Sequence, residues 1–153
     1  MVESRGKGAA RAGMAAPGCK ITYPIGATPV IKVTEVQHQQ ALYHWWQVYA
    51  RSRKLPVKAF IHSPNEGRRS YKAAAVLQSE GMQKGVPDVF IAVPAGGKHG
   101  LWVELKTLKG KPTPEQEEYI SLLQAQGYAA AICRGWESAR DTIIAYLMAE
   151  GDA

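Results

Sequence analysis

The chain is constrained most by two short apolar runs on either side of a glycine-rich turn. Val89–Val93 and Leu101–Leu105 flank Pro94–Gly100. Apolar runs that are separated by turn residues are typical of a β-hairpin. Because side chains alternate along a strand, neighbouring residues of each run should lie on opposite faces. The stretch therefore predicts two adjacent strands.

Charged residues stand on this hairpin where a core strand would be apolar. Asp88 opens the first strand, and Glu104 and Lys106 share one face of the second strand with Trp102. Asp88 lies near Glu104 if the register of the strands allows it. Two carboxylates that are close together repel each other unless a cation lies between them. Hard oxygen ligands suit Mg²⁺ or Mn²⁺ better than Zn²⁺, so the hairpin predicts a site for one of these ions.

Each of these charges also has a purely structural explanation. Asp88 follows Pro87, and an aspartate in that position is often a turn cap. The charges on the adjacent strand argue against this explanation. Glu104 and Lys106 on an exposed strand face would form an ion pair that contributes about 0–1 kcal/mol. The residues alone leave that second explanation open.

The order of motifs along the chain resembles a known family. Pro87-Asp88 followed by Glu104-Leu105-Lys106 is similar to the signature of the restriction-endonuclease-like nucleases, PD-(D/E)xK, although so short a pattern also occurs by chance. The surrounding motifs are more specific. They resemble the VRR-NUC branch, the virus-type replication-repair nuclease domain, from about Thr34 to Leu147. These motifs are His62 to Gly67, Glu80-Gly81-Met82, Gly85 to Asp88, Gly100 to Thr107, Lys109-Gly110 with Pro114-Glu115-Gln116, and Gln126-Gly127-Tyr128.

The resemblance implies a catalytic centre and a substrate. Asp88, Glu104 and the backbone carbonyl of Leu105 would hold Mg²⁺ or Mn²⁺, and Lys106 would stand beside the ion. A helix-borne glutamate, here Glu35, would assist the metal through bound water. The substrate would be DNA of replication and repair in branched forms such as four-way (Holliday) junctions, flaps or nicked ends. Stand-alone members of phage type are implied to be homodimers that cut four-way junctions by paired incisions.

Two capping boxes, Thr34-x-x-Gln37 and Thr113-x-x-Gln116, mark the starts of two long helices. Glu35 lies in a first turn, where a carboxylate interacts favourably with the helix dipole by about 0.3–1 kcal/mol without any catalytic role. Gln116 is fully explained as the capping partner of Thr113. It also heads the inward-facing stripe of its helix, and the related nucleases carry a glutamine there that faces the site. Both explanations of Gln116 remain open.

Basic residues are concentrated in the first half of the chain. Residues 1–72 hold 12 Lys and Arg against 3 Asp and Glu, whereas residues 73–153 hold 7 against 10. A basic half suggests a polyanionic partner, although a basic surface without a partner would look the same. Asn65 is either a turn residue or a contact to the substrate. The candidate DNA contacts are Asn65, then Arg68, Arg69 and Lys72 at the start of a helix, and Lys109 and Lys111 past the second hairpin strand.

Length and composition fit one domain, since the chain has 153 residues, of which 46% are hydrophobic and 21% charged. Residues 1–30 are rich in Gly, Ala, Pro and basic residues and predict a flexible basic arm before a nuclease domain over 31–150. No apolar run approaches the roughly 18 residues of a membrane span, and none resembles a secretory signal. The two isolated cysteines, Cys19 and Cys133, favour a reducing cytoplasm, that of a bacterial host if the protein is phage-encoded.

Periodicity and turn residues predict the order helix, strand, helix, strand, strand, helix, strand, helix. This order is typical of an α/β fold with a mixed four-stranded sheet flanked by helices, which is the restriction-endonuclease-like core that the resemblance implies. The strand Tyr128–Cys133 carries no charge and is expected to be buried on both faces. The other elements outside the hairpin are expected from Thr34 to about Arg53, over Val57–His62, from Arg68 to about Ser79, from Thr113 to Gln126, and from Trp136 to about Met148.

The predicted function is that of a structure-specific DNA endonuclease that depends on Mg²⁺ or Mn²⁺. One alternative is a non-catalytic DNA-binding module with a nuclease-like fold, against which the intact Asp88, Glu104 and Lys106 argue. Another is a flap or end nuclease in place of a junction resolvase. A metabolic enzyme with a divalent ion is disfavoured, because Gly96-Gly97-Lys98 lies in a hairpin turn and not at the start of a helix.

Overall fold

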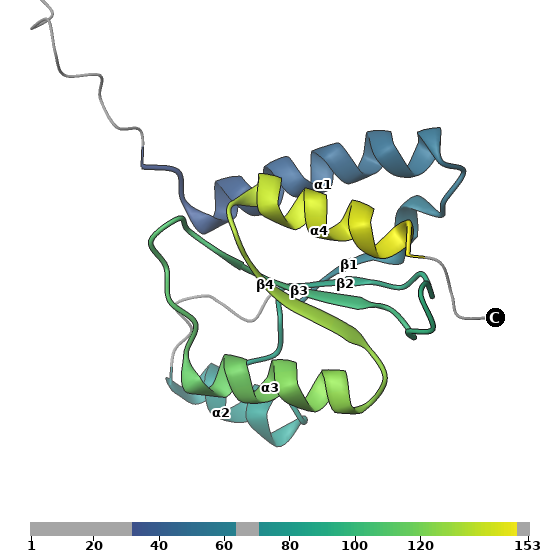
Figure 1. Cartoon of the computed structure of the whole chain (residues 1–153). Coiled ribbons are helices and arrows are strands. Elements are labelled where there is room, and N and C mark those ends of the chain that lie inside the picture. Colours follow the sequence, from purple (N-terminus) through teal and green to yellow (C-terminus); the bar gives the residue numbers. More distant parts are fainter. Residues whose placement is uncertain (1–31, 64–70, 150–153) are drawn as a thin grey trace, which may run out of the picture. The chain divides into compact units, whose positions relative to one another are not determined.

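The computed structural model describes residues 32–63 and 71–149, and within them the helices and strands follow the predicted order (Figure 1). The predicted arm over residues 1–30 lies outside the described residues. In chain order the elements are α1 (Glu35–Ser52), the 3₁₀ helix η1 (Val57–Ala59), β1 (Phe60–His62), α2 (Tyr71–Ser79), β2 (Val89–Ile91), β3 (Leu101–Lys106), α3 (Pro114–Ala125), β4 (Ala129–Arg134) and α4 (Trp136–Leu147).

The four strands form one sheet in the order β1-β2-β3-β4. β1 pairs with β2 and β2 with β3 in antiparallel fashion, whereas β3 and β4 are parallel. The parallel pair requires a crossover, and α3 supplies it. The mixed α/β sheet flanked by helices is therefore confirmed.

The hydrophobic core lies on the face of the sheet that α1 and α4 cover (Figure 1). Trp46 of α1 and Ile143 of α4 are fully buried there, against Val103 and its neighbours on β3. The alternate residues of β3, including Glu104, face the other side, where α3 packs. One face of β3 thus supplies the core, while the other presents polar side chains to α3.

The first two strands in chain order, β1 and β2, differ from expectation at their ends. Val57–Ala59 is a 3₁₀ turn and not part of the first strand, and the indole of Trp46 donates to the carbonyl of Val57 at 2.9 Å. β2 ends at Ile91 and not at Val93. The carbonyl of Val93 accepts from the Tyr146 hydroxyl at 2.7 Å, so α4 takes the place of a strand partner there.

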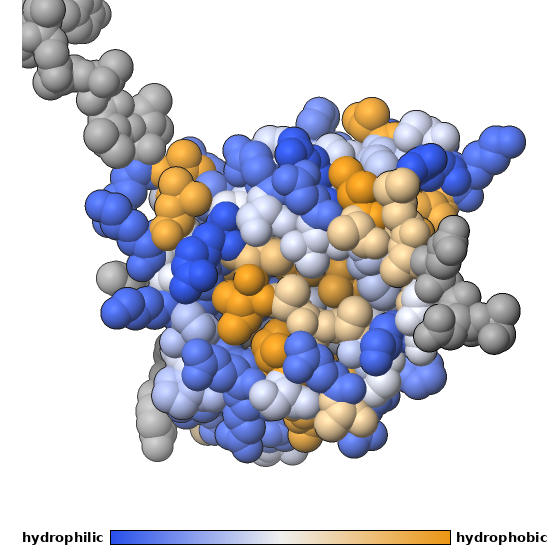
Figure 2. All heavy atoms as spheres, viewed as in Figure 1, coloured by the Kyte–Doolittle hydropathy of each residue, from blue (hydrophilic) through white to orange (hydrophobic). Residues whose placement is uncertain are grey.

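The expectation that the last strand is buried on both faces is wrong, because β4 is an edge strand. Its first four residues are half-buried, and only Cys133 is fully buried. Figure 2 shows hydrophobic residues gathered across the middle of the view, over this edge and between α3 and α4. The side-chain amide of Gln124 donates to the carbonyl of Ala130 at 2.9 Å, which occupies one backbone group of the open edge.

None of the helices in the described ranges is both long and apolar enough to cross a membrane.

Candidate active site

The register of the hairpin places Asp88 opposite Glu104. Val89 pairs with Val103, and one further step along the antiparallel ladder brings Asp88 against Glu104. Opposite residues of an antiparallel pair project to the same face, with Cβ atoms about 4.5–5.5 Å apart. The two carboxylates that the sequence singled out are therefore on one face of the sheet, on adjacent strands.

Pro87 alters the ladder at the next position. The same register places Pro87 opposite Leu105, at a position where the two backbones would exchange hydrogen bonds. Proline has no N–H, so β2 offers the Leu105 carbonyl no donor there. The N–H of Leu105 instead donates to Oδ2 of Asp88 at 2.8 Å. This hydrogen bond to a side chain in place of a strand partner orients the Asp88 carboxylate toward β3. It also leaves the carbonyl oxygen of Leu105 directed to the same place.

Glu104 is withdrawn from solvent and held by two side chains. Only 1% of its side chain is exposed. Its Oε1 lies 2.8 Å from Nζ of Lys106, whose side chain is 7% exposed, and accepts from the side-chain amide of Gln116 at 2.5 Å. The pair is thus not the exposed surface ion pair that the sequence left open. Buried charges require partners of this kind, because burial of an isolated carboxylate is very costly.

Gln116 makes the capping contact and also faces Glu104, so the two positions that the sequence left open for it are compatible. Its Oε1 accepts from the backbone N–H of Thr113 at 2.9 Å, which completes the capping box of α3. Its Nε2 donates to Glu104. The two contacts together fix the orientation of the amide, because a flipped amide would put its oxygen against the carboxylate. The start of α3 is consequently tied to the middle of β3.

The loop before Asp88 makes close backbone contact with the same end of α3. Gly85 has a φ of +81°, and a Cβ atom built on it would lie 2.4 Å from the carbonyl oxygen of Glu115 and 3.0 Å from the backbone nitrogen of Gln116. Only glycine fits so close an approach with a positive φ. The Gly85-to-Asp88 motif therefore fixes the distance between the Asp88 strand and the Gln116 helix.

Glu35 lies in the first turn of α1 and is half-buried. One turn later, Nδ1 of His38 accepts from the backbone N–H of Trp136 at 3.3 Å. Gly135, next to Trp136, donates its N–H to the carbonyl of Lys106 at 2.9 Å. This chain of contacts brings the first turns of α1 to the end of β3 that carries Lys106. The water-mediated role of Glu35 stays a prediction.

The candidate DNA contacts are only partly described. Asn65, Arg68 and Arg69 lie outside the described residues, and of Lys72 only the backbone, in α2, is described. Lys109 and Lys111 are exposed in the loop after β3.

Arg134 is a further basic residue at this end of the sheet, one that the sequence motifs did not indicate. It pairs with Lys106 in the β3–β4 register, is exposed, and donates from Nε to the carbonyl of Gly110 at 3.3 Å. The signal was a single basic residue directly after an apolar strand.

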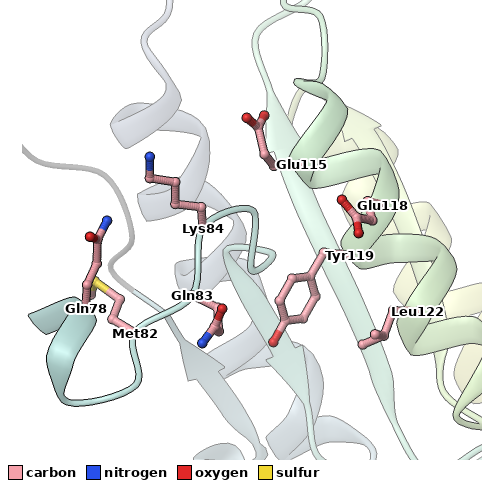
Figure 3. A pocket seen from close by; sticks show the side chains of 8 residues that line it. All are labelled: Gln78, Met82, Gln83, Lys84, Glu115, Glu118, Tyr119 and Leu122. Atoms are coloured by element: carbon pink, nitrogen blue, oxygen red, sulfur yellow. The ribbon is translucent and has the colours of Figure 1, made fainter.

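A cleft of about 560 Å³ lies between the loop after α2 and α3 (Figure 3). Glu115, Glu118 and Tyr119 line it from α3, and Lys84 lies across from them. Two carboxylates on one wall would repel a phosphate backbone. This cleft is therefore a poor path for DNA, although it lies beside the Gly85 contact.

The oxygen donors at the hairpin fit a hard divalent cation. Asp88 and Glu104 supply carboxylates from adjacent strands, and Leu105 supplies a carbonyl. Within residues 32–63 and 71–149, no group of three or more His, Cys, Asp and Glu side chains is placed to hold a metal ion. A site here would therefore need the backbone carbonyl and water beside the two carboxylates, which is the ligand set that Mg²⁺ accepts.

Comparisons with known proteins agree with this fold. The model of the VRR-NUC domain family matches residues 29–137. A solved structure described as a VRR_NUC domain protein superposes with a TM-score of 0.64 at 26% sequence identity, covering 78% of this chain and 92% of the other. A search of curated proteins gave no match. The chain therefore belongs to the VRR-NUC domain family, which implies a nuclease-like function in DNA processing.

Proposed function

We propose that the protein is a DNA endonuclease that requires Mg²⁺ or Mn²⁺ and hydrolyses phosphodiester bonds in branched DNA. The observation that carries the proposal is the environment of Glu104. A carboxylate that is 1% exposed, held by Lys106 and Gln116, lies opposite Asp88 in the register. Buried charged groups arranged in this way are concentrated at functional sites.

Asp88, Glu104 and the carbonyl of Leu105 would hold the cation. When bound, such an ion binds the phosphate and lowers the pKa of a coordinated water. The protein's own part is to keep the two carboxylates in place. Leu105 orients Asp88 through its N–H, while Gln116 and Lys106 orient Glu104.

Lys106 brings a positive charge to the side of Glu104 that faces α3. An ammonium group there can orient the attacking water and stabilise negative charge as it develops on the phosphate. Nζ of Lys106 lies 2.8 Å from Oε1 of Glu104, so the lysine already pairs with a carboxylate. We therefore assign it positioning and electrostatic stabilisation in preference to proton abstraction.

Binding to DNA would depend on backbone contacts and not on base sequence. Lys109, Lys111 and Arg134 surround the end of β3 with exposed positive charge. Contacts of this kind bind phosphates and make affinity fall as salt rises. A homodimer would present two such sites to the pseudo-symmetric arms of a four-way junction.

A cleavage panel tests the proposal. End-labelled four-way junction, flap, fork, plain duplex and single strand are incubated with Mg²⁺, with Mn²⁺ or with a chelator, and the products are mapped. Wild type should cut branched DNA only with a divalent ion, with paired symmetric nicks in the junction. Lys106→Ala should bind DNA but cut at least 100-fold more slowly, in line with the loss of an electrostatic catalyst.

Three results would change the conclusion. DNA binding by wild type without cleavage under any metal condition would favour a non-catalytic module. Cuts confined to flaps or ends would replace the junction with those substrates. If the protein cut junctions but had the mass of a monomer in solution, paired incision by a stable dimer would be excluded.

A further inference from the structure

A second pocket, of about 380 Å³, lies between α1 and β1. Its lining residues come from α1 and β1: Gln39, Gln40, Tyr43, Phe60 and His62. The Tyr43 and Phe60 rings are 5.2 Å apart and inclined at 53°, and 42% of Tyr43 is exposed to solvent. The pocket therefore offers an aromatic surface with polar groups at its margin.

One lining residue of the pocket, His62, contacts the backbone of Asp88, whose side chain belongs to the candidate active site on the other face of the sheet. Nδ1 of His62 lies 2.9 Å from the carbonyl oxygen of Asp88, which also accepts from the N–H of Ser63 at 2.8 Å. On α1, Glu35, Gln39 and Tyr43 follow at intervals of four and so share one stripe. That stripe runs from the predicted site glutamate to the pocket.

One polar atom of the pocket is left without a partner. Oε1 of Gln39 is buried and has no hydrogen-bond partner among the described residues. A buried acceptor without a donor destabilises the protein, and because this oxygen exposes less than 1 Å², a ligand in the pocket would bond it only after the Gln39 side chain turned toward the pocket. The carboxamide of Gln40 also lines the pocket and can both donate and accept.

These features fit an unstacked nucleobase. The lining residues include no carboxylate and no Lys or Arg, so the pocket does not suit a phosphate or another anion. An exposed aromatic ring, here that of Tyr43, with amide groups beside it is how proteins hold splayed-out bases, which stack on the ring and hydrogen-bond through their edges. A volume of 380 Å³ is in the range of small-molecule pockets and too small for a folded partner segment.

We infer that this pocket, formed around Tyr43 and Gln39, binds the unpaired nucleobase next to the cleaved phosphate and so selects branched over plain duplex DNA. The inference rests on the proposed nuclease function, because the phosphate must lie at Asp88 for the neighbouring base to reach Tyr43. A fully paired duplex would have to unstack a base at a cost of a few kcal/mol, whereas a branch point presents one already unpaired.

The test is a binding cycle with the full-length chain in Ca²⁺, which takes the same kind of oxygen ligands as Mg²⁺, under conditions where no cleavage product forms. The probe is a fluorescent flap DNA whose cut position has been mapped with wild type. It carries either a base or an abasic residue at the first unpaired nucleotide beside that position. The variants are Tyr43→Ala, Tyr43→Phe, and Val48→Ala as a control on the exposed side of α1, where Val48 is 60% exposed.

Tyr43→Ala should weaken binding of the intact flap on the order of ten-fold, as loss of one stacked base does. Wild type should bind the abasic flap more weakly than the intact flap by the same factor. Tyr43→Ala should bind the two flaps equally, because the substitution and the abasic residue remove the same interaction. Tyr43→Phe and Val48→Ala should bind as wild type does. Separately, 5-iodouracil at that nucleotide should photo-crosslink to Tyr43 in wild type, a result that needs no variant to fold.

The inference and the proposed function fail in different ways. Two results, with wild type that binds and cuts the flap, would show that the pocket does not hold a base. In the first, Tyr43→Ala binds the intact flap as tightly as wild type does. In the second, Tyr43→Ala weakens binding of the abasic flap as much as binding of the intact flap. A crosslink that maps away from the pocket leads to the same conclusion. If Tyr43→Ala instead changes the mass of the protein in solution, the pocket binds a second copy of the chain. Wild type that binds no DNA would overturn both.

Discussion

Gln116 donates its side-chain amide to Oε1 of Glu104 at 2.5 Å while its own oxygen accepts the N–H of Thr113 at 2.9 Å. One amide thereby joins the cap of α3 to a buried carboxylate on β3. The two roles depend on different atoms of the amide, so substitution can separate them.

Gln116→Glu should keep the capping box, since glutamate is also suited to its position, but it replaces the donor to Glu104 with a second carboxylate. We expect DNA cleavage to fall roughly 10- to 100-fold, as for other groups that orient metal ligands, with far-ultraviolet circular dichroism unchanged. Gln37→Glu in the capping box of α1 is the matched control and should leave cleavage unaltered. Equal cleavage by both variants would show that the contact to Glu104 has no catalytic consequence.

Metal binding should stabilise the fold through Asp88 and Glu104. A ligand at about 100 times its Kd contributes about 2.7 kcal/mol to the free energy of unfolding, so Mn²⁺ should raise the melting temperature of wild type. Asp88→Asn and Glu104→Gln should abolish that rise. Asp141→Asn, which changes a carboxylate that is 64% exposed on α4, should retain it. A rise that persists in both site variants would place the ion elsewhere.

Gly85→Ala should destabilise the protein by more than a positive φ alone explains. The added Cβ would lie 2.4 Å from the Glu115 carbonyl, so α3 must move away from the Asp88 loop. Gly97→Ala is the control, because Gly97 has a φ of +68° with nothing within 4 Å of the added atom. In urea unfolding we expect Gly97→Ala to lower the free energy of unfolding by about 1–2 kcal/mol and Gly85→Ala to lower it clearly more. Similar losses in the two variants would mean that α3 moves away from the added Cβ atom without loss of stability.

Tyr146 should make the stability of the protein depend on pH in alkaline solution. Its hydroxyl accepts from the N–H of Ala95 and donates to the carbonyl of Val93, and burial raises the pKa of Tyr146. Because the folded state holds the proton more tightly, this stabilisation is complete below about pH 10 and is lost as the pH rises through the raised pKa.

Tyr146→Phe should lower the free energy of unfolding by about 1–3 kcal/mol at neutral pH. The carbonyl of Val93 loses the hydroxyl donor, and the N–H of Ala95 keeps only its 3.3 Å bond to the carbonyl of Lys98. The unfolding free energy of Tyr146→Phe should also fall less than that of wild type between about pH 9 and pH 11. Urea unfolding at both values measures the difference. If the unfolding free energies of Tyr146→Phe and wild type fell equally between these pH values, the raised pKa of Tyr146 would be contradicted.

Arg134→Ala should weaken DNA binding at every sequence alike and should reduce its salt dependence. Each phosphate contact contributes about 0.9 to the slope of log K against log salt, so the slope should become shallower by about that amount. Arg140→Ala is the control, since that guanidinium pairs with Asp141 on α4. An unchanged slope for Arg134→Ala would remove this residue from the DNA-binding surface.

Local sequence features predicted the elements correctly because they act within a few residues. The capping boxes at Thr34 and Thr113 are present as expected and begin α1 and α3. The expectations that were wrong concern strand ends and strand burial, which depend on contacts with residues far away in the chain. β2 stops early because Tyr146, more than fifty residues away, bonds the backbone at Val93. β4 is half-exposed because no further strand among the described residues lies beyond it in the sheet.

The sequence by itself determined which chemical groups the hairpin carries, because alternation along a strand and a proline at its start are local properties. Asp88, Glu104 and Lys106 followed from that pattern together with the family motifs. Only the tertiary structure decided that the Glu104–Lys106 pair is buried, that Gln116 has two partners, and that Arg134 stands beside Lys106. Burial, strand register and helix docking depend on contacts between segments far apart in the chain, and no short-range pattern specifies them.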